Sequence, residues 1–188
     1  MAKKALLTIN DTYRKVKKGF ITVDSVYHKI KKAYITIGGV YRPCWSGGEL
    51  AYYGTVMELS VARDNLAATT VGDYALFGGG YASGDYSSVV DAYNLSLTRT
   101  TPTALSAARM NIAATAVGDY ALFGGGYASG IYFSVVDAYN LSLTRTTPTA
   151  LSVARRYIAA TTVGNYALFG GGYASGGSSS VVDAYTIA

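Results

Sequence analysis

Short apolar segments alternate with glycine-containing turns along most of this chain. In one stretch, residues 112–117 form an apolar segment, 118–119 give a Gly-Asp turn signal, and 120–123 form a second apolar segment. Apolar runs of this kind, bounded by glycine and aspartate, are typical of two β-strands joined by a hairpin. A third strand is expected over 135–139 and a fourth over 144–151. The pattern therefore predicts an all-β protein built from units of four antiparallel strands.

This unit recurs with a period of 46 residues. The segment VGDYALFGGGYASG begins at Val71 and at Val117, and VGNYALFGGGYASG begins at Val163. Residues 64–109 and 110–155 differ only at positions 64, 66, 70, 85, 87 and 107. Self-similarity at a fixed period indicates a repeat architecture. Because a catalytic site occurs once, near-identical copies favour a protein that is not an enzyme.

Residues 1–46 form a second kind of module with a repeat of its own. Tyrosines recur every 14 residues in it, at Tyr13, Tyr27 and Tyr41. The alternating segments 20–23 and 34–37 are followed by Asp-Ser and Gly-Gly, which are turn residues. This pattern predicts a small antiparallel β-meander. A meander this short is marginally stable alone, so we expect it to dock on a partner assembly through the three tyrosines and Trp45.

Charge separates the two modules. Residues 1–46 carry a net charge of +8, and the remainder carries −3. The change falls at the Gly-containing stretch 47–49, which we interpret as a linker before residues 50–188. The lysines of the first module are interpreted as a solvated face rather than a polyanion-binding surface, so nucleic acid is not an expected partner.

Composition excludes several classes. Half of the chain is hydrophobic, with 22 Gly, 18 Tyr and 3 Pro, which indicates a globular protein with a core. Cys44 is the sole cysteine, so neither an internal disulfide nor a cysteine-based zinc site is expected. No apolar run approaches the length of a membrane span or a signal peptide. We therefore expect synthesis in the cytoplasm without a signal peptide.

The residues of the longer repeat resemble a kelch repeat. An apolar strand ends in Gly-Gly over 76–79, another strand over 89–93 ends in tyrosine, and an arginine precedes each following unit, at Arg63, Arg109 and Arg155. The resemblance covers residues 50–188 and implies a β-propeller used mostly for binding. The chain departs from the family in its fourth strand, where small residues around Thr100 and Thr146 replace a tryptophan.

The tandem Tyr/Lys module beside short kelch-like repeats also resembles structural proteins of phages and prophages of Gram-positive bacteria. This resemblance implies a virion protein of the tail, baseplate or fibre that attaches through residues 1–46. The alternative is an intracellular kelch-type adaptor that binds another protein in the cytoplasm.

The repeats are circularly permuted in this reading. Aligning Arg63 with Arg109 places residues 50–59 on a fourth strand, so 156–188 would be completed by 50–63. Propellers have about four to eight blades, so three repeats predict a homo-oligomer, most simply a dimer. The alternative fold is a pseudo-threefold β-trefoil or β-prism.

Candidate catalytic groups do not combine into a known site. Aspartates recur at Asp91, Asp137 and Asp183, and turn residues recur at Asp73, Asp119 and Asn165. We interpret both sets as turn and strand-end residues that satisfy backbone donors. The sole histidine, His28, has no partner for a nucleophilic triad. No cofactor and no metal are expected.

Divergence between the repeats indicates a binding face. The copies differ mainly in the loop between the second and third strands and in the loop that enters the first strand, and both loops emerge on one side of an antiparallel unit. Loops rich in Tyr, Ser and Gly suit recognition of a cell-surface glycan or a protein receptor, although unconstrained drift explains divergence equally well. The candidate binding residues are Asp85, Tyr86, Ser87, Ile131, Tyr132, Phe133, Asn65, Asn111, Arg156 and Tyr157.

Overall fold

The computed structural model describes residues 20–23, 26–29, 32–37, 40–46 and 50–187, and for the first four of these ranges it describes the backbone. The chain divides into two compact units, Met1–Gly54 and Thr55–Ala188. All regular elements in the described part of the chain are β-strands, and their sheets are antiparallel. None of the described segments is a helix long and apolar enough to cross a membrane.

The described part of the first unit contains two β-hairpins. Strand β1 (Phe20–Val23) pairs with β2 (Val26–Lys29), and β3 (Lys32–Ile37) pairs with β4 (Val40–Ser46). A register shift between Ala33 and Tyr34 interrupts the second hairpin. The two hairpins form separate two-stranded sheets. The strands predicted over 20–23 and 34–37 are therefore confirmed, but the described strands are not joined into one meander.

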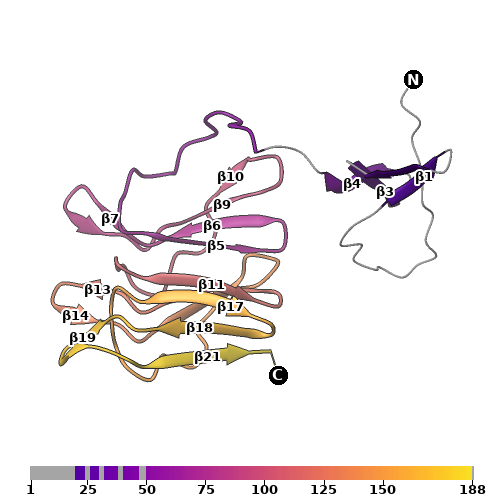
Figure 1. Ribbon diagram of the computed structural model, residues 1–188. Helices are drawn as coiled ribbons and strands as arrows, with labels where there is room; N and C mark the ends of the chain where they lie inside the picture. Colours follow the sequence, from indigo (N-terminus) through magenta and orange to yellow (C-terminus); the bar gives the residue numbers. More distant parts are fainter. Residues whose placement is uncertain (1–19, 24–25, 30–31, 38–39, 47–49, 188) are drawn as a thin grey trace. The chain divides into compact units, whose positions relative to one another are not determined.

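The second unit contains three repeat sheets, which are stacked in chain order in Figure 1. The first consists of β5 (Ala67–Val71), β6 (Tyr74–Gly78), β9 (Val90–Tyr93) and β10 (Arg99–Thr100). The second consists of β11 (Ala113–Val117), β12 (Tyr120–Gly124), β15 (Val136–Tyr139) and β16 (Arg145–Thr146). The third consists of β17 (Ala159–Val163), β18 (Tyr166–Gly170) and β21 (Val182–Thr186).

A short hairpin extends from each repeat between its second and third sheet strands. These hairpins are β7 (Tyr81–Ala82) with β8 (Asp85–Tyr86), β13 (Tyr127–Ala128) with β14 (Ile131–Tyr132), and β19 (Tyr173–Ala174) with β20 (Gly177–Ser178). The sequence predicted an irregular loop here, because a glycine triplet and isolated tyrosines carry no strand periodicity.

Two expectations about the fourth strand need correction. It was predicted over 144–151 but covers only Arg145–Thr146, because the following residues turn away to begin the next repeat. Residues 50–59, expected as a fourth strand, form no strand. Within the chain, residues 50–63 do not complete the third sheet: Ser60 and Arg63 instead bond to Asp91 of the first repeat.

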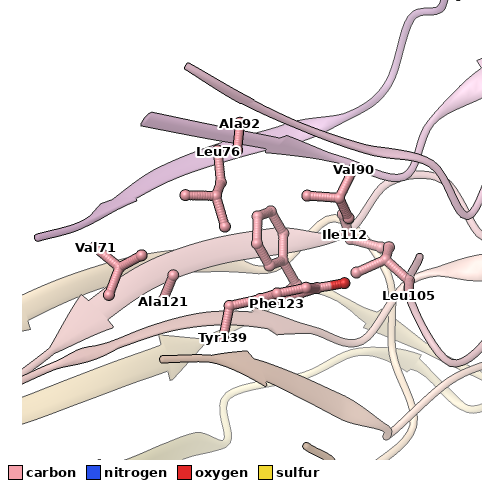
Figure 2. Packing of buried hydrophobic residues seen from close by; sticks show 9 residues of the cluster. All are labelled: Val71, Leu76, Val90, Ala92, Leu105, Ile112, Ala121, Phe123 and Tyr139. Atoms are coloured by element: carbon pink, nitrogen blue, oxygen red, sulfur yellow. The ribbon is translucent and has the colours of Figure 1, made fainter. Parts of the chain in front are cut away.

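Neighbouring sheets pack through matching apolar residues. The first junction contains Val71, Leu76, Val90 and Ala92 from one repeat, and Leu105, Ile112, Ala121, Phe123 and Tyr139 from the next repeat and the segment that leads into it (Figure 2). The Phe123 ring lies against Gly78, where an added Cβ would come within 2.9 Å of the ring. Phe169 takes the same place against Gly124. In the first two repeats, the glycine that ends the second strand thus leaves space for the phenylalanine ring of the following repeat. We call this space the glycine socket.

The first strands of the three sheets lie closest together. Strand β11 packs against both β5 and β17. Each sheet therefore has an inner strand that faces its neighbours and an outer edge formed by β10, β16 or β21.

Candidate functional site

The two divergent loops of each repeat meet on one side of the second unit. Backbone bridges join Asp64 to Tyr81, Met110 to Tyr127 and Arg156 to Tyr173. Each bridge connects the loop that enters the first strand to the hairpin between the second and third strands. The expectation that these loops share one side is therefore confirmed, and together they form what we call the loop face.

A row of tyrosines runs across the loop face from one repeat to the next. Successive ring centroids are 5.3 Å apart for Tyr81 and Tyr86, 6.3 Å for Tyr86 and Tyr127, and 5.6 Å for Tyr127 and Tyr132. The row ends at Tyr173, 6.3 Å from Tyr132. These separations and the mainly edge-to-face angles are those of favourable aromatic pairs.

Arg156 lies at the end of this row that belongs to the third repeat. Its guanidinium carbon is 4.5 Å from the Tyr127 ring centroid, 4.9 Å from Tyr157 and 5.4 Å from Tyr132. A guanidinium over tyrosine faces is held by cation–π attraction. Its Nε has no hydrogen-bond partner, and no described carboxylate pairs with it. The Nε atom itself is buried, and the cluster therefore holds a positive charge among the tyrosine rings that no described carboxylate neutralises.

The residue after Arg156, Tyr157, has a strained backbone conformation. Asn65, Asn111 and Tyr157 occupy equivalent positions with φ values of 53°, 54° and 56°. Asparagine adopts this left-handed conformation readily, whereas tyrosine seldom does. The three residues are linked in a column, because Asn111 N donates to Asn65 O at 3.0 Å and Tyr157 N donates to Asn111 O at 3.1 Å. The fold thus holds Tyr157 in a costly conformation while its side chain remains exposed.

The structure brings together most of the candidate binding residues. Asp85 and Ile131 are exposed on their hairpins, and Tyr86, Tyr132, Arg156 and Tyr157 belong to the tyrosine row or border it. Ser87 and Asn111 are buried. The backbone N–H groups of Ser87 and Phe133 bond Gly80 and Gly126. The divergent residues Ser87 and Phe133 therefore lie at the base of their hairpins rather than at the exposed tips.

Three of the five tyrosines in the row were missed from the sequence. Tyr81, Tyr127 and Tyr173 are identical in all three repeats, so a search for divergent positions passes over them. Their signal is the pair of tyrosines in each of the first two YASG hairpins, Tyr81 opposite Tyr86 and Tyr127 opposite Tyr132.

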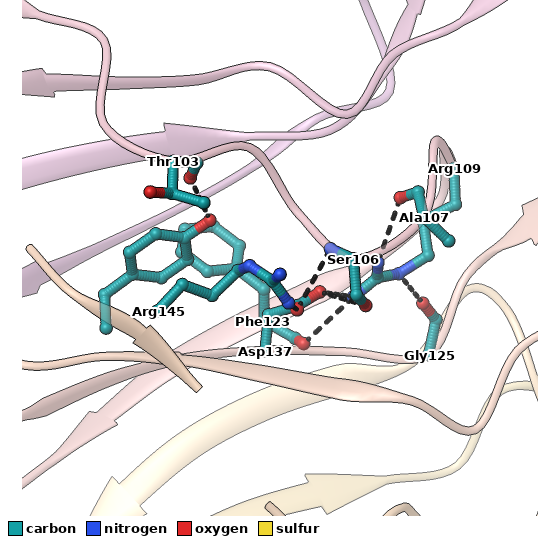
Figure 3. Close-up of polar contacts among 9 residues, drawn as sticks. Thr103, Ser106, Ala107, Arg109, Phe123, Gly125, Asp137 and Arg145 are labelled. Atoms are coloured by element: carbon teal, nitrogen blue, oxygen red, sulfur yellow. Dashed lines mark hydrogen bonds and ion pairs between the residues drawn. The ribbon is translucent and has the colours of Figure 1, made fainter. Parts of the chain in front are cut away.

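The recurrent aspartates lie in a different place, beneath buried arginines. Arg109 is fully buried and donates from Nε to Gly125 O at 2.8 Å, and from Nη2 to Phe123 O at 3.3 Å and to Asp137 Oδ2 at 2.8 Å (Figure 3). Burial lowers the pKa of Arg109, and the Asp137 carboxylate opposes this shift. Arg63 pairs with Asp91 at 2.8 Å and Arg155 pairs with Asp183 in the same way.

The second oxygen of Asp137 is also occupied. Ser106 N donates to Oδ1 at 3.1 Å, and Arg145 Nη1 donates to the same oxygen at 2.9 Å. Both oxygens of the Asp137 carboxylate therefore accept hydrogen bonds from within the fold, as expected of a buried polar group. The interpretation that these aspartates satisfy backbone donors is confirmed, but the sequence did not predict their pairing with an arginine 28 residues earlier.

The opposite side carries the Gly-Asp turns. A shallow depression of about 260 Å³ is lined by Asp119, Tyr120 and residues 140–142. The described residues contain no group of three His, Cys, Asp or Glu side chains close enough to hold a metal.

The residues expected to dock on an assembly lie on the first unit. Tyr13 and the linker 47–49 are outside the described residues, Tyr27 lies on β2, and Tyr41 and Trp45 lie on β4.

Comparison with known proteins places the fold only. No protein-family model matches the chain, and no curated protein matches it significantly. Among the matching solved structures is that of YjhT, with a TM-score of 0.63 and 16% sequence identity. The match covers 73% of this chain and 46% of the YjhT chain, so this chain spans about half of that structure.

Proposed function

We propose that the three repeats are kelch-like blades of a β-propeller. Each repeat is a four-stranded antiparallel unit, counting the three-stranded third sheet as an incomplete copy. Their inner strands face one another, as propeller blades require. The Gly-Gly socket and the arginine that carried the resemblance both act at the junctions, through Phe123 on Gly78 and Arg109 on Asp137. These features support blades over a β-trefoil or β-prism.

We further propose that the protein is a binding module without catalytic activity, and that the loop face is its recognition surface. The observation that carries this proposal is the tyrosine row with Arg156 and the strained Tyr157. Backbone strain persists only where the surrounding structure enforces it, and it concentrates at functional sites. Rigid aromatic side chains on a fixed scaffold supply binding area at low entropic cost.

The ligand class follows from the chemistry of the face. Tyrosine rings provide flat apolar surfaces with hydroxyl groups at their edges, and Arg156 provides a positive charge that no described carboxylate pairs with. A glycan of a host cell surface offers both apolar ring faces and many acceptor oxygens. An acidic group on that glycan would pair with Arg156, because charge-assisted hydrogen bonds are the stronger kind.

The sequence supports a virion as the setting. The basic module of residues 1–46, with its tandem Tyr/Lys repeat, is proposed to attach the protein to the tail, baseplate or fibre of a phage. The second unit would then present the loop face to the host. An intracellular adaptor that uses the same face for a protein ligand remains the competing proposal.

The test compares the two sides of the second unit. Tyr132→Ala and Arg156→Ala remove an aromatic ring and the cation from the loop face, and Tyr120→Ala on the turn side is the matched control because it is also a partly exposed tyrosine. Truncation of a binding hot spot weakens affinity by about 30-fold, corresponding to about 2 kcal/mol. Binding is measured to a glycan array and to purified Gram-positive cell walls.

We expect the two loop-face variants to lose binding and Tyr120→Ala to retain it. Equal binding by all three variants would place recognition elsewhere. Binding to proteins of a bacterial lysate with none to glycans or walls would favour the adaptor.

A further inference from the structure

Each junction between repeats is built from two different halves. The earlier repeat supplies two valines, a leucine and an alanine, and the later repeat supplies a phenylalanine, a tyrosine and three smaller apolar residues. The same halves recur 46 residues later at the second junction. There Val117, Leu122, Val136 and Ala138 meet Leu151, Ile158, Ala167, Phe169 and Tyr185.

The third repeat presents the first half of such a junction, and none of the described residues forms a second half against it. Its residues are Val163, Leu168, Val182 and Ala184, identical in type to those of both buried junctions. Val163 is 60% exposed, whereas its equivalent Val117 is 5% exposed. Val182 is also 60% exposed, and its equivalent Val136 is fully buried.

The glycine socket of the third repeat is empty as well. An added Cβ at Gly78 or Gly124 would meet a phenylalanine ring at 2.9 Å, but at Gly170 it would meet only Val182 of the same repeat, at 3.4 Å. Gly171 is likewise open, whereas its equivalent Gly125 lies against Ile158 and Arg155 O.

The first repeat presents the matching second half. Subtracting 46 from the later-repeat residues of the first junction gives Leu59, Leu66, Ala75, Phe77 and Tyr93. Only one of the five differs in type, since Leu66 stands where Ile112 does. Phe77 packs edge-on against Tyr93 at 5.8 Å, as Phe123 does against Tyr139. No earlier repeat in the chain supplies a glycine socket for Phe77.

We infer that the open face of the third repeat binds the first repeat of a second copy of this chain. In this contact Phe77 of the second copy occupies the Gly170 socket. The second copy is the occupant because it carries five apolar residues, four of them identical, at the spacing with which the equivalent residues fill this face at both junctions within the chain.

Polar groups fit the same contact. At the second junction the hydroxyls of Thr115 and Thr162 are 2.8 Å apart. The equivalents across the proposed contact are Thr161 and Thr70 of the second copy, so both hydroxyls are again present. The backbone column also extends, because Tyr157 O is the next acceptor and Asn65 N is the donor that begins the column.

Two copies close the assembly into a ring. A head-to-tail contact makes a ring when its rotation closes and a filament when it does not. The match that covers 73% of this chain covers 46% of YjhT, so two sets of three repeats correspond to about the whole of that chain. The dimer then has two identical contacts and six repeats.

This inference concerns assembly and goes beyond the proposed recognition function. Its tests measure mass and cross-linking and involve no glycan, so failure of either proposal leaves the other standing.

Cross-linking between cysteines tests the contact directly. The full chain with Cys44→Ser, Thr70→Cys and Thr161→Cys carries thiols only at the proposed contact, and the single-cysteine chains are the controls. Mild oxidation should give a covalent species of two chains on non-reducing gels, and neither control should give it. An internally cross-linked single chain, a ladder of larger polymers, or no cross-link would overturn the ring.

Light scattering supplies the second measurement. The wild-type mass should be twice the 19.7 kDa of the chain at micromolar concentration. Val182→Asp places a charge on the proposed contact at a position already exposed in one chain, so it should halve the mass while the circular dichroism spectrum is retained. Ile131→Asp, equally exposed on the loop face, should leave the dimer intact. A wild-type monomer, or a dimer that survives Val182→Asp, would overturn the inference.

Discussion

The second and third repeats carry the same apolar junction residues but differ in their surroundings. Val117 and Val136 are buried in the second repeat, whereas Val163 and Val182 at the same positions of the third repeat are exposed. Burial here is therefore a property of the neighbouring repeat rather than of the residue. This behaviour is expected of repeat proteins, in which stability is a sum of repeat and interface terms.

The largest effect should come from breaking the buried ion pair of the second repeat. Asp137→Asn leaves Arg109 buried without its counter-charge, and loss of one partner from a buried pair costs about 3–5 kcal/mol. Asp183→Asn should cost less, because the Asp183 side chain is 15% exposed and no second arginine pairs with it in the described residues. Urea unfolding at one protein concentration measures both values.

Asp119→Asn on the exposed turn is the control and should change stability by less than about 0.5 kcal/mol. Equal losses for Asp137→Asn and Asp183→Asn would show that the two repeats are equally protected.

The second-largest effect on stability should come from adding a methyl group to the glycine sockets, and the second and third repeats should respond differently. Gly124→Ala forces the Phe169 ring away from a contact at 2.9 Å, and overpacking of this kind costs about 1–3 kcal/mol. Gly170→Ala meets no ring within its own chain, so the monomer should tolerate it. The same methyl should weaken pairing with a second copy, which light scattering detects. A large loss of monomer stability from Gly170→Ala would contradict the empty socket.

Local sequence pattern was sufficient to predict the repeat period and the first three strands of each unit. Strand alternation and Gly-Asp turns are set by neighbouring residues, so the hairpin of Val117 and Tyr120 is readable without tertiary information. The meeting of the two divergent loops also followed, because antiparallel connectivity fixes which loops share a side.

The features that were not predicted depend on contacts between residues far apart in the sequence. The pairing of Arg109 with Asp137 joins residues 28 positions apart, and nothing local to either predicts it. The fourth strand was predicted to be too long, because residues 147–151 form the connection to the next repeat. Three of the five tyrosines in the row were missed because the row arises from stacking of hairpins, in which Tyr86 of one repeat meets Tyr127 of the next.

Alkaline pH should lower the stability of the second and third repeats through the equivalent tyrosines Tyr139 and Tyr185. Burial, followed by the nearby aspartate, raises the pKa of Tyr185 to about 12, and the same causes raise that of Tyr139. Each hydroxyl donates to a backbone carbonyl, Tyr139 to Thr103 O at 2.7 Å and Tyr185 to Thr149 O at 2.8 Å. The folded state therefore holds these protons after the unfolded state has lost them.

The contribution of the two tyrosines to stability should consequently be constant below about pH 9 and fall above the unfolded tyrosine pKa of about 10. The contribution of Tyr185 is lost as the pH rises through about 12. Urea unfolding between pH 8 and pH 11 should show a shallower decline for Tyr139→Phe and Tyr185→Phe. Each variant should also lose about 0.5–1.5 kcal/mol at neutral pH with its hydrogen bond. An unchanged slope in both variants would rule out these two tyrosines as its source.

The smallest effect on stability should come from changing Tyr157. At this position the third repeat has a tyrosine in a left-handed conformation, where the other two repeats have asparagine. Tyr157→Asn restores the asparagine found at Asn65 and Asn111, and asparagine accepts a φ near 56° more readily. Relief of left-handed strain is worth about 1–2 kcal/mol, and loss of the Arg156 contact at 4.9 Å costs about 0.5–1 kcal/mol. The variant should therefore be slightly more stable in thermal unfolding yet weaker in glycan or cell-wall binding. Tyr157→Phe keeps the backbone strain and the ring, so it should show no gain in stability. A gain in both variants would mean that the hydroxyl of Tyr157, rather than its backbone conformation, is the source of the strain.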